Sequence, residues 1–210
     1  MPELPEVEIV KRSLKNKVKN KKIKQIIISN RNLRFKVEKN FENLLEGRSI
    51  TSVSRFSKYI ILSLDNHYYC LIHLGMSGTL HLIDHKKKEK ITNLSFYHSQ
   101  ILPKKHNHIK IKFSNFMIVY NDPRRFGFFK LFKNKQEINK YFEKKGPEAI
   151  SSKFNYKYIK NKLENKNKNI KNFLLDQNFV SGIGNIYSNE ILFHCKINPL
   201  KLAKKINNKN

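Results

Sequence analysis

The stretch that decides the fold is HIKIKFSNFMIVY, residues 108–120. Ile109, Ile111 and Phe113 alternate with lysines, which is the pattern of a half-buried β-strand. Ser114 and Asn115 indicate a hairpin turn, and FMIVY predicts the returning strand. The sequence therefore predicts a β-hairpin at this position.

Further strand patterns lie on both sides of this hairpin. They are SVSRFSKYIILSL at 52–64, YYCLIHLGMSGTLHLI at 68–83 and GFFKLF at 127–132. Residues 5–14 predict a short helix, because Val7, Val10 and Leu14 repeat at helical spacing. Many short strands with one leading helix favour a sandwich or barrel up to residue 132.

The pattern becomes helical from about residue 135. Helix-like segments lie at 136–145, 154–165, 168–177 and 186–197, and we expect Pro199 to stop the last of them. The basic tail at 201–210 is expected to fray. Glycine, proline and serines cluster at 146–152, near the change in character. We predict an α+β protein with a β-sandwich domain at 1–132, flanked by helices, and a helical domain at 133–210.

Composition favours a polyanionic partner. Lysine and arginine total 43 against 16 acids, which gives a formal charge of +27. Such an excess attracts nucleic acid, although drift in an AT-rich genome could also produce tracts rich in Lys, Asn and Ile. No apolar run is long enough to span a bilayer, so a cytoplasmic protein is expected. Separately, we expect a monomer. Two cysteines without a CxxC pattern exclude a Cys-rich zinc site in this chain.

The chain opens with MPELPEVE, which places a proline directly after the initiator methionine. Loss of Met1 would expose Pro2 as a secondary amine, and a free α-amino group is partly unprotonated near neutral pH. Such an amine can attack a sugar C1′ and form an imine, with Glu3 donating a proton to the ring oxygen. The alternative is an ordinary helix start, with acids in its first turn and proline at its first position.

Other segments offer candidate contacts to DNA, each with a simpler alternative. Lys58 could act as an acid or phosphate ligand, or be a solvated strand lysine. Met76, between two glycines, could be an apolar wedge in a base stack or a core gap-filler. In NDPRRFG, Arg124 could replace hydrogen bonds to an orphaned base and Phe126 could stack in the gap, or the segment could be a salt-bridged turn.

Two further candidates are a histidine and an asparagine. His106 could contact phosphate. With His108 it also forms an HxH pair, a spacing found in metal sites, but no third ligand lies nearby in the sequence. Asn185 follows the glycine loop SGIGN, whose backbone N–H groups could face an anion. Asn185 could contact phosphate or simply cap the following helix.

Taken in order, these segments resemble the formamidopyrimidine-DNA glycosylase family. The motifs are MPELPEVE, RFSKYIIL, HLGMSG, KKHNHI, NDPRRFG and SGIGNIYSNE, spread from residue 1 to about 200. PELPEVE resembles the branch that acts on oxidised purines, whereas the endonuclease VIII type usually opens PEGPE. The resemblance implies a DNA-binding cleft and a flipped-out damaged base.

The resemblance also implies residue roles. Pro2 matches the family nucleophile, Glu3 its proton donor, Lys58 the lysine of β-elimination and Glu6 a further acid of the site. Three residues match those that fill the void left by the flipped base in the family: Met76, Arg124 and Phe126. Four residues match the family's contacts to the DNA backbone: His106, Lys166, Lys171 and Asn185. The implied function is excision of oxidised purines from double-stranded DNA, with cleavage at abasic sites in a bacterial cytoplasm.

The sequence departs from the family after about residue 200. Family members continue with the rest of a helix–two-turn–helix motif and a zinc finger of the CxxC…CxxC kind, so we expect an incomplete motif, no zinc and no other cofactor. A noncatalytic or decayed damaged-DNA-binding protein on the same scaffold is the alternative function. A basic RNA-binding protein is a third possibility, for which only the charge argues.

Overall fold

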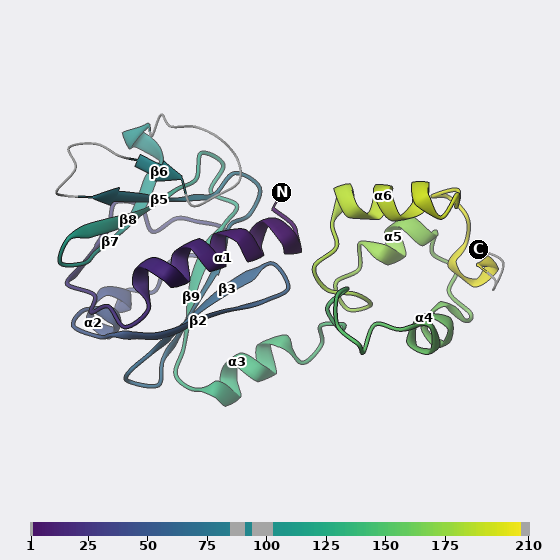
Figure 1. The fold of residues 1–210 in the computed structure, drawn as a ribbon, viewed down its shortest axis with the longest axis horizontal. Helices are drawn as coiled ribbons and strands as arrows, with labels where there is room; N and C mark the ends of the chain where they lie inside the picture. Colours follow the sequence, from purple (N-terminus) through teal and green to yellow (C-terminus); the bar gives the residue numbers. More distant parts are fainter. Residues whose placement is uncertain (1, 85–90, 94–102, 207–210) are drawn as a thin grey trace. The chain divides into compact units, whose positions relative to one another are not determined.

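The computed structural model describes residues 2–84, 91–93 and 103–206. The chain divides into two compact units, Met1–Asn139 and Lys140–Asn210. The first unit contains two antiparallel sheets with helices, and the second is helical (Figure 1). The predicted α+β class is confirmed.

The first unit is built on nine strands in its described part. The five-stranded sheet has the order β1-β7-β8-β5-β6, and the four-stranded sheet has the order β2-β3-β4-β9. Their bounds are β1 Gln25–Ile28, β2 Ile50–Phe56, β3 Tyr59–Leu64, β4 Tyr69–His73, β5 Thr79–Asp84, β6 Ile91–Asn93, β7 Asn107–Lys112, β8 Phe116–Asn121 and β9 Phe128–Phe132. Side chains from both sheets meet in one hydrophobic core.

The predicted hairpin at 108–120 is confirmed as β7 and β8. Ile111 pairs with Ile118 across the two strands. The backbone N–H of Phe113 donates to the carbonyl of Phe116 at 2.8 Å and closes the turn. Ile109 is fully buried, whereas Lys110 is only half-buried. The alternation of apolar and charged residues therefore follows the two faces of the sheet.

Helix α1, Leu4–Val18, is longer than the helix predicted at residues 5–14. Its five buried side chains lie on one face, and the helix contacts β2 and β3. Burying an aliphatic side chain of this kind contributes about 1.5–3 kcal/mol. Five of them are enough to hold a chain start that would otherwise fray. A short helix, α2 at Phe41–Leu45, and the 3₁₀ turn η1 at Lys104–His106 complete the unit.

The second unit contains α4 Tyr156–Leu163, α5 Ile170–Leu174, α6 Asn185–His194 and the 3₁₀ turn η2 Ala203–Lys205, while α3 Lys135–Phe142 spans the division between the units. Helix α6 ends at His194, five residues before Pro199, which was expected to stop it, because Lys196 adopts φ 54°. The expectation of a frayed tail is wrong for residues 201–206. Ala203 is fully buried, and its N–H donates to the carbonyl of Lys168 at 2.9 Å. Residues 207–210 of that tail lie outside the described part.

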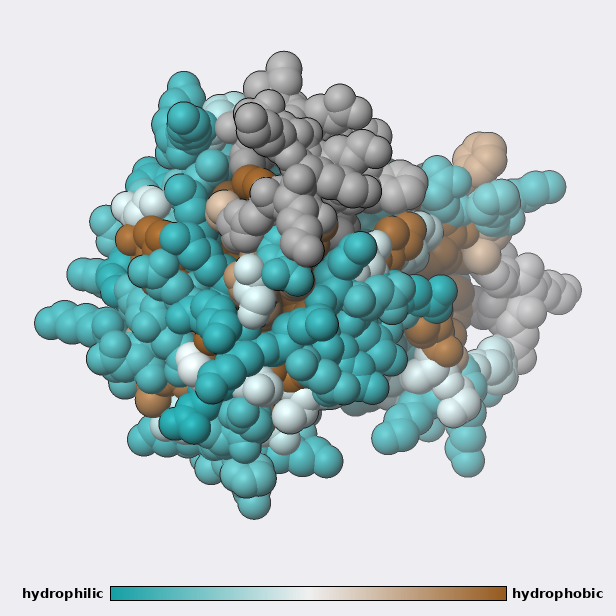
Figure 2. Space-filling view, turned by 60° about the vertical axis from the view of Figure 1, so that its left-hand side comes forward, coloured by the Kyte–Doolittle hydropathy of each residue, from teal (hydrophilic) through white to brown (hydrophobic). Residues whose placement is uncertain are grey.

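One face of the molecule is mainly polar. Figure 2 shows that most of the coloured side chains on this face are hydrophilic, with apolar areas between them. Among the helices that the structure describes, none has the length and apolar character needed to cross a membrane.

Candidate active site and DNA-contact residues

The start of α1 brings the predicted catalytic residues together. Pro2 and Glu3 are buried directly before the helix, and Glu3 is 2% exposed. Lys58 lies in the turn between β2 and β3 and is 5% exposed. Burial lowers the pKa of Lys58 below its ordinary value, while the charges of Glu3 and Glu6 act in the opposite direction. The alternative of a solvated lysine on a strand face is therefore wrong.

Glu3 and Glu6 hold each other through a capping box. The backbone N–H of Glu3 donates to Glu6 Oε2 at 2.9 Å, and the Glu3 side chain accepts from the backbone N–H of Glu6. The helix start thus fixes two carboxylates beside Lys58. Loss of Met1, on which a free Pro2 amine depends, falls outside the described residues.

Glu8 braces the turn that bears Lys58, a role the sequence did not reveal. Arg55 Nε donates to Glu8 Oε2 at 2.9 Å, and Arg55 Nη1 donates to the carbonyl of Ser57 at 2.8 Å. Ser57 adopts φ 54°, a backbone conformation that a serine rarely takes without support. Because Arg55 and Glu8 lie 47 residues apart, no local pattern could indicate their contact.

Replacing Glu8 by Gln should destabilise the protein. Burial acts to raise the pKa of Glu8, but hydrogen bonds from Lys11, Arg55 and Arg12 outweigh it and lower the pKa to about 2 from 4.5. The ionised form is therefore favoured by the fold, and its stabilising contribution is present above pH 4.5 and lost as the pH falls toward 2. We expect Glu8→Gln to lower the free energy of unfolding by about 1–3 kcal/mol at pH 7.

Urea unfolding of both proteins at several pH values measures this effect. The difference between the wild type and Glu8→Gln should shrink as the pH falls below 4.5. Glu143→Gln, at an exposed position, is the matched control and should change little. A difference that stays constant with pH would show that the Glu8 charge contributes nothing.

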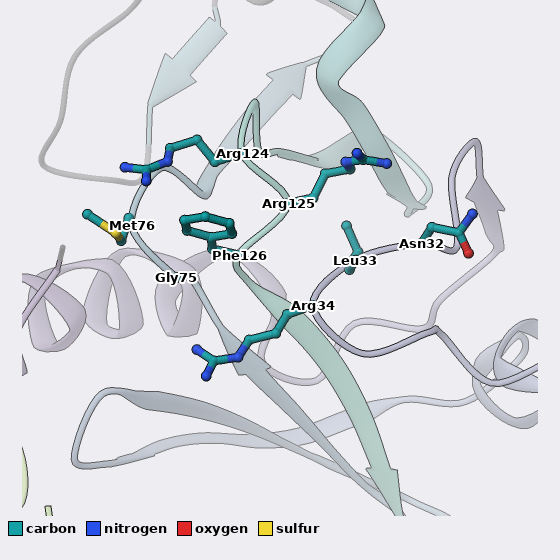
Figure 3. Close-up of a pocket in the computed structure, with 8 residues that line it drawn as sticks. All are labelled: Asn32, Leu33, Arg34, Gly75, Met76, Arg124, Arg125 and Phe126. Carbon is teal, nitrogen blue, oxygen red and sulfur yellow. The ribbon is translucent and has the colours of Figure 1, made fainter.

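The three predicted void-filling residues form one exposed cluster. Met76 is 48% exposed and Phe126 is 41% exposed, so neither is a core filler. The Arg124 guanidinium lies over the Phe126 ring, 4.5 Å from its centroid. Figure 3 shows Arg124 extending over Phe126 toward Met76. An arginine stacked on an aromatic ring, together with a flexible thioether, can stack against a nucleic-acid base.

A buried carboxylate, Asp122, joins the two turns of this cluster. It is fully buried, and its Oδ1 accepts from the Ser77 hydroxyl in the Met76 turn. Its Oδ2 accepts from the Gly127 N–H at 2.9 Å and from the Tyr120 hydroxyl at 2.8 Å. Burial and the Asp122 charge raise the pKa of Tyr120, so that hydroxyl remains a donor. The sequence indicated only a turn at NDP and missed this role.

Gly75 permits the close approach of the two turns. It adopts φ +67°, and a Cβ at this position would lie 2.5 Å from the backbone nitrogen of Gly127. Such a distance is far below van der Waals contact, so only glycine fits. The glycines around Met76 therefore serve the geometry of the cluster.

The two histidines of the HxH pair have different roles. His106 is half-buried, and its carbonyl accepts from the Asp122 N–H at 3.0 Å. His108 is buried, with Nε2 2.8 Å from the carbonyl oxygen of Asp122. His108 is thus part of the core, while the His106 side chain remains at the surface edge where a phosphate could reach it.

The cysteines of this chain do not fit a zinc site of the kind expected in other members of the resembled family. Cys70 is fully buried, and burial, with the charge of Glu38, raises the pKa of its thiol. Cys195 is exposed and lies in the other unit. Within the described residues, no group of three or more His, Cys, Asp or Glu could hold a metal ion.

The second unit places the remaining candidates at its surface. Lys166 is exposed between α4 and α5, and Lys171 is half-exposed on α5. Gln177 holds the glycine loop, because its Oε1 accepts from the Gly182 N–H at 3.0 Å and its Nε2 donates to the Ile183 carbonyl at 2.8 Å. The N-cap of α6 is Gly184, so the capping role considered for Asn185 is wrong. Asn185 is the exposed first residue of the helix.

Comparison with known proteins gives one consistent result. Residues 1–129 match the model of the formamidopyrimidine-DNA glycosylase N-terminal domain, and residues 145–210 match that of its H2TH domain. A formamidopyrimidine-DNA glycosylase of Wolbachia sp. subsp. Drosophila simulans is 40% identical over 98% of this chain and 71% of its own length. That of Legionella pneumophila (strain Paris) is 39% identical over 98% and 70%.

Solved structures agree with the sequence comparison. The complex of Lactococcus lactis Fpg with abasic-site DNA has a TM-score of 0.85 and 31% identity, over 98% of this chain and 72% of that one. The complex of the wild-type Lactococcus lactis protein with oxidised-pyrimidine DNA has a TM-score of 0.85 at 31% identity, over 99% and 73%. The fold and the domain matches define a DNA glycosylase scaffold for base excision repair. The chain belongs to the formamidopyrimidine-DNA glycosylase family.

Proposed function

We propose that this protein excises oxidised purines from double-stranded DNA and cleaves the strand at the resulting abasic site. The observation that supports this most strongly is the buried group at the start of α1. Pro2, Glu3 and Lys58 are all buried, and the charges of Glu3 and Glu6 act on Lys58. A buried lysine with a lowered pKa, placed beside two carboxylates, is typical of an active site.

The proposed excision step begins once Met1 has been removed. The Pro2 nitrogen attacks C1′ of the damaged nucleotide and loses its proton. The bond from C1′ to the base breaks, and the base leaves with the bonding electron pair and takes up a proton, which balances the one lost from nitrogen. Glu3 donates a proton to the sugar ring oxygen, which opens the ring and leaves an iminium ion on Pro2. Because Pro2 is a secondary amine, this ion keeps its positive charge and cannot relax by losing a proton from nitrogen.

The proposed cleavage step uses that positive charge. It makes the C2′ proton acidic, and loss of this proton expels the 3′ phosphate by β-elimination. Lys58, whose pKa is lowered by burial, is suited to move protons in this step. Water then hydrolyses the imine and releases Pro2. We assign β-elimination to these residues, and the proposed steps use no metal.

DNA contacts outside this group fit the same proposal. The cluster of Met76, Arg124 and Phe126 would fill the gap left by the flipped base. His106, Lys171 and Asn185, with Lys166, would contact the backbone. The formal charge of +27 would strengthen such contacts, because affinity increases with the number of phosphates neutralised.

An incision assay on a duplex containing 8-oxoguanine tests the proposal. We expect strand cleavage at the lesion, with an unsaturated aldehyde as the main 3′ end, and much less cleavage of a duplex with an oxidised pyrimidine. Binding that weakens with salt but brings no cleavage and no borohydride-trapped adduct would instead support a noncatalytic DNA-binding protein. Preference for structured RNA over damaged duplex would reject both.

A further inference from the structure

A cavity of about 680 Å³ lies beside the void-filling cluster. One wall is the cluster itself, and the other is a loop that the proposed function does not use. Its lining residues are Asn32, Leu33, Arg34, Gly75, Met76, Arg124, Arg125 and Phe126. The volume is within the usual range for small-ligand sites, which includes the size of a nucleotide.

The chemistry of the lining suits a nucleotide. The charged groups among the eight lining residues are three arginines, and the set contains no acid. An amide from Asn32 and apolar surface from Leu33 and Phe126 complete the walls. Guanidinium groups bind phosphate, while aromatic and apolar surfaces contact bases and sugars. Figure 3 shows Arg125 extending toward Asn32, away from Arg124.

The loop wall is built firmly. Leu33 is buried, and the Phe35 ring packs edge-on against Phe128 with centroids 4.9 Å apart. Arg31 pairs with Glu42, and its Nη1 donates to the carbonyl of Glu38 at 2.7 Å. Arg31 therefore fixes the base of the loop, whereas the exposed Arg34 side chain lines the cavity.

The loop is also joined to the void-filling cluster. The backbone N–H of Arg34 donates to the carbonyl of Gly127, the residue after Phe126, at 3.2 Å. The position of Arg34 relative to Phe126 is thus set by the backbone. Whatever enters the cavity must lie next to the base stack that Phe126 enters.

We propose that this cavity binds a backbone nucleotide of the undamaged strand, with Arg34 contacting its phosphate. This rests on the proposed function, in which Arg124 faces the base left without a partner. Pro2, Glu3 and Lys58 do not line the cavity, so it is not the place of the flipped lesion. With the flipped lesion excluded, the other part of the DNA next to the cluster is the undamaged strand, which carries the unpaired base.

Binding to a duplex with an uncleavable abasic-site analogue, followed at several salt concentrations, tests the proposal. Arg34→Ala should reduce the slope of log affinity against log salt by about 1. Affinity at moderate salt should fall about tenfold. Lys36→Ala is the matched control, because Lys36 is exposed on the same loop and has the same charge but does not line the cavity.

Neutral methylphosphonates, introduced singly along the undamaged strand, identify the contact. The wild type and Lys36→Ala should lose affinity at one position near the gap, and Arg34→Ala should be insensitive there. Equal effects of both variants, or a sensitive phosphate in the damaged strand, would overturn the assignment. A wild-type protein that binds the analogue no better than intact duplex would reject the proposed function itself, and this inference with it.

Discussion

Protein that retains Met1 should form no covalent adduct with abasic DNA. In that form the Pro2 nitrogen is part of an amide, and an amide nitrogen cannot attack C1′. Pro2 is also buried, so removal of Met1 has to free the nitrogen and give the sugar access to it. We expect incision of a damaged duplex to fall by about 10³-fold or more, as when other enzymes lose a catalytic nucleophile.

Two preparations of the same sequence make this comparison, one beginning at Pro2 and one with Met1 attached, each verified by mass spectrometry. Borohydride trapping on abasic DNA should give an adduct with the first preparation only. Pro2→Gly should also lose most of the adduct, because an imine from a primary amine can lose its charge. Binding to an uncleavable analogue is the control and should be similar in all three. An equal yield of adduct with Met1 attached would disprove Pro2 as the nucleophile.

The sequence predicted those parts of the fold that local patterns determine. The β7–β8 hairpin followed from alternation of apolar and charged residues between 108 and 120. Helix α1 followed from helical spacing, although the continuation to Val18 was missed. The early end of α6 was also missed, because a positive φ at Lys196 stops the helix and no proline or glycine announces it.

The candidate site was only partly visible in the sequence. Single positions such as Lys58 and Met76 could be singled out, but their burial or exposure depends on contacts between distant segments. The brace from Glu8 to Arg55 joins a helix to a strand 47 residues away. Asp122 looked like part of a turn, yet it is the buried acceptor that joins the Met76 turn to the Arg124 turn. Such roles come from tertiary structure, which a single sequence does not show.

The buried Asp122 holds the two turns of the void-filling cluster in place. Asp122 is fully buried and accepts hydrogen bonds from both turns, so displacing either turn would take at least one donor away from a buried carboxylate. Losing one such hydrogen bond costs about 1–3 kcal/mol. Met76 and Phe126 can therefore be exposed, which is unfavourable for apolar side chains, without the turns that bear them becoming loose.

Glu3 and Lys58 should affect different steps of the reaction. Glu3→Gln keeps an oxygen that can accept the cap hydrogen bond from Glu6, but it removes the proton that excision requires. We expect base excision to fall by about 10²–10⁴-fold, the usual contribution of general acid catalysis. Trapping on DNA that already contains an abasic site should change far less, because no base has to leave.

Lys58→Met should have the opposite effect, slowing cleavage of abasic DNA rather than formation of the imine. Its side chain can occupy the buried space without the charge, so the imine still forms on abasic DNA while β-elimination slows. The ratio of trapped adduct to cleaved strand should therefore rise in Lys58→Met, whereas it should stay near the wild-type value in Glu3→Gln. Thermal unfolding of both variants shows whether the fold is intact. If both variants lost excision and cleavage in equal proportion, the two side chains would have no separate chemical roles, and their shared burial would serve the stability of the helix start alone.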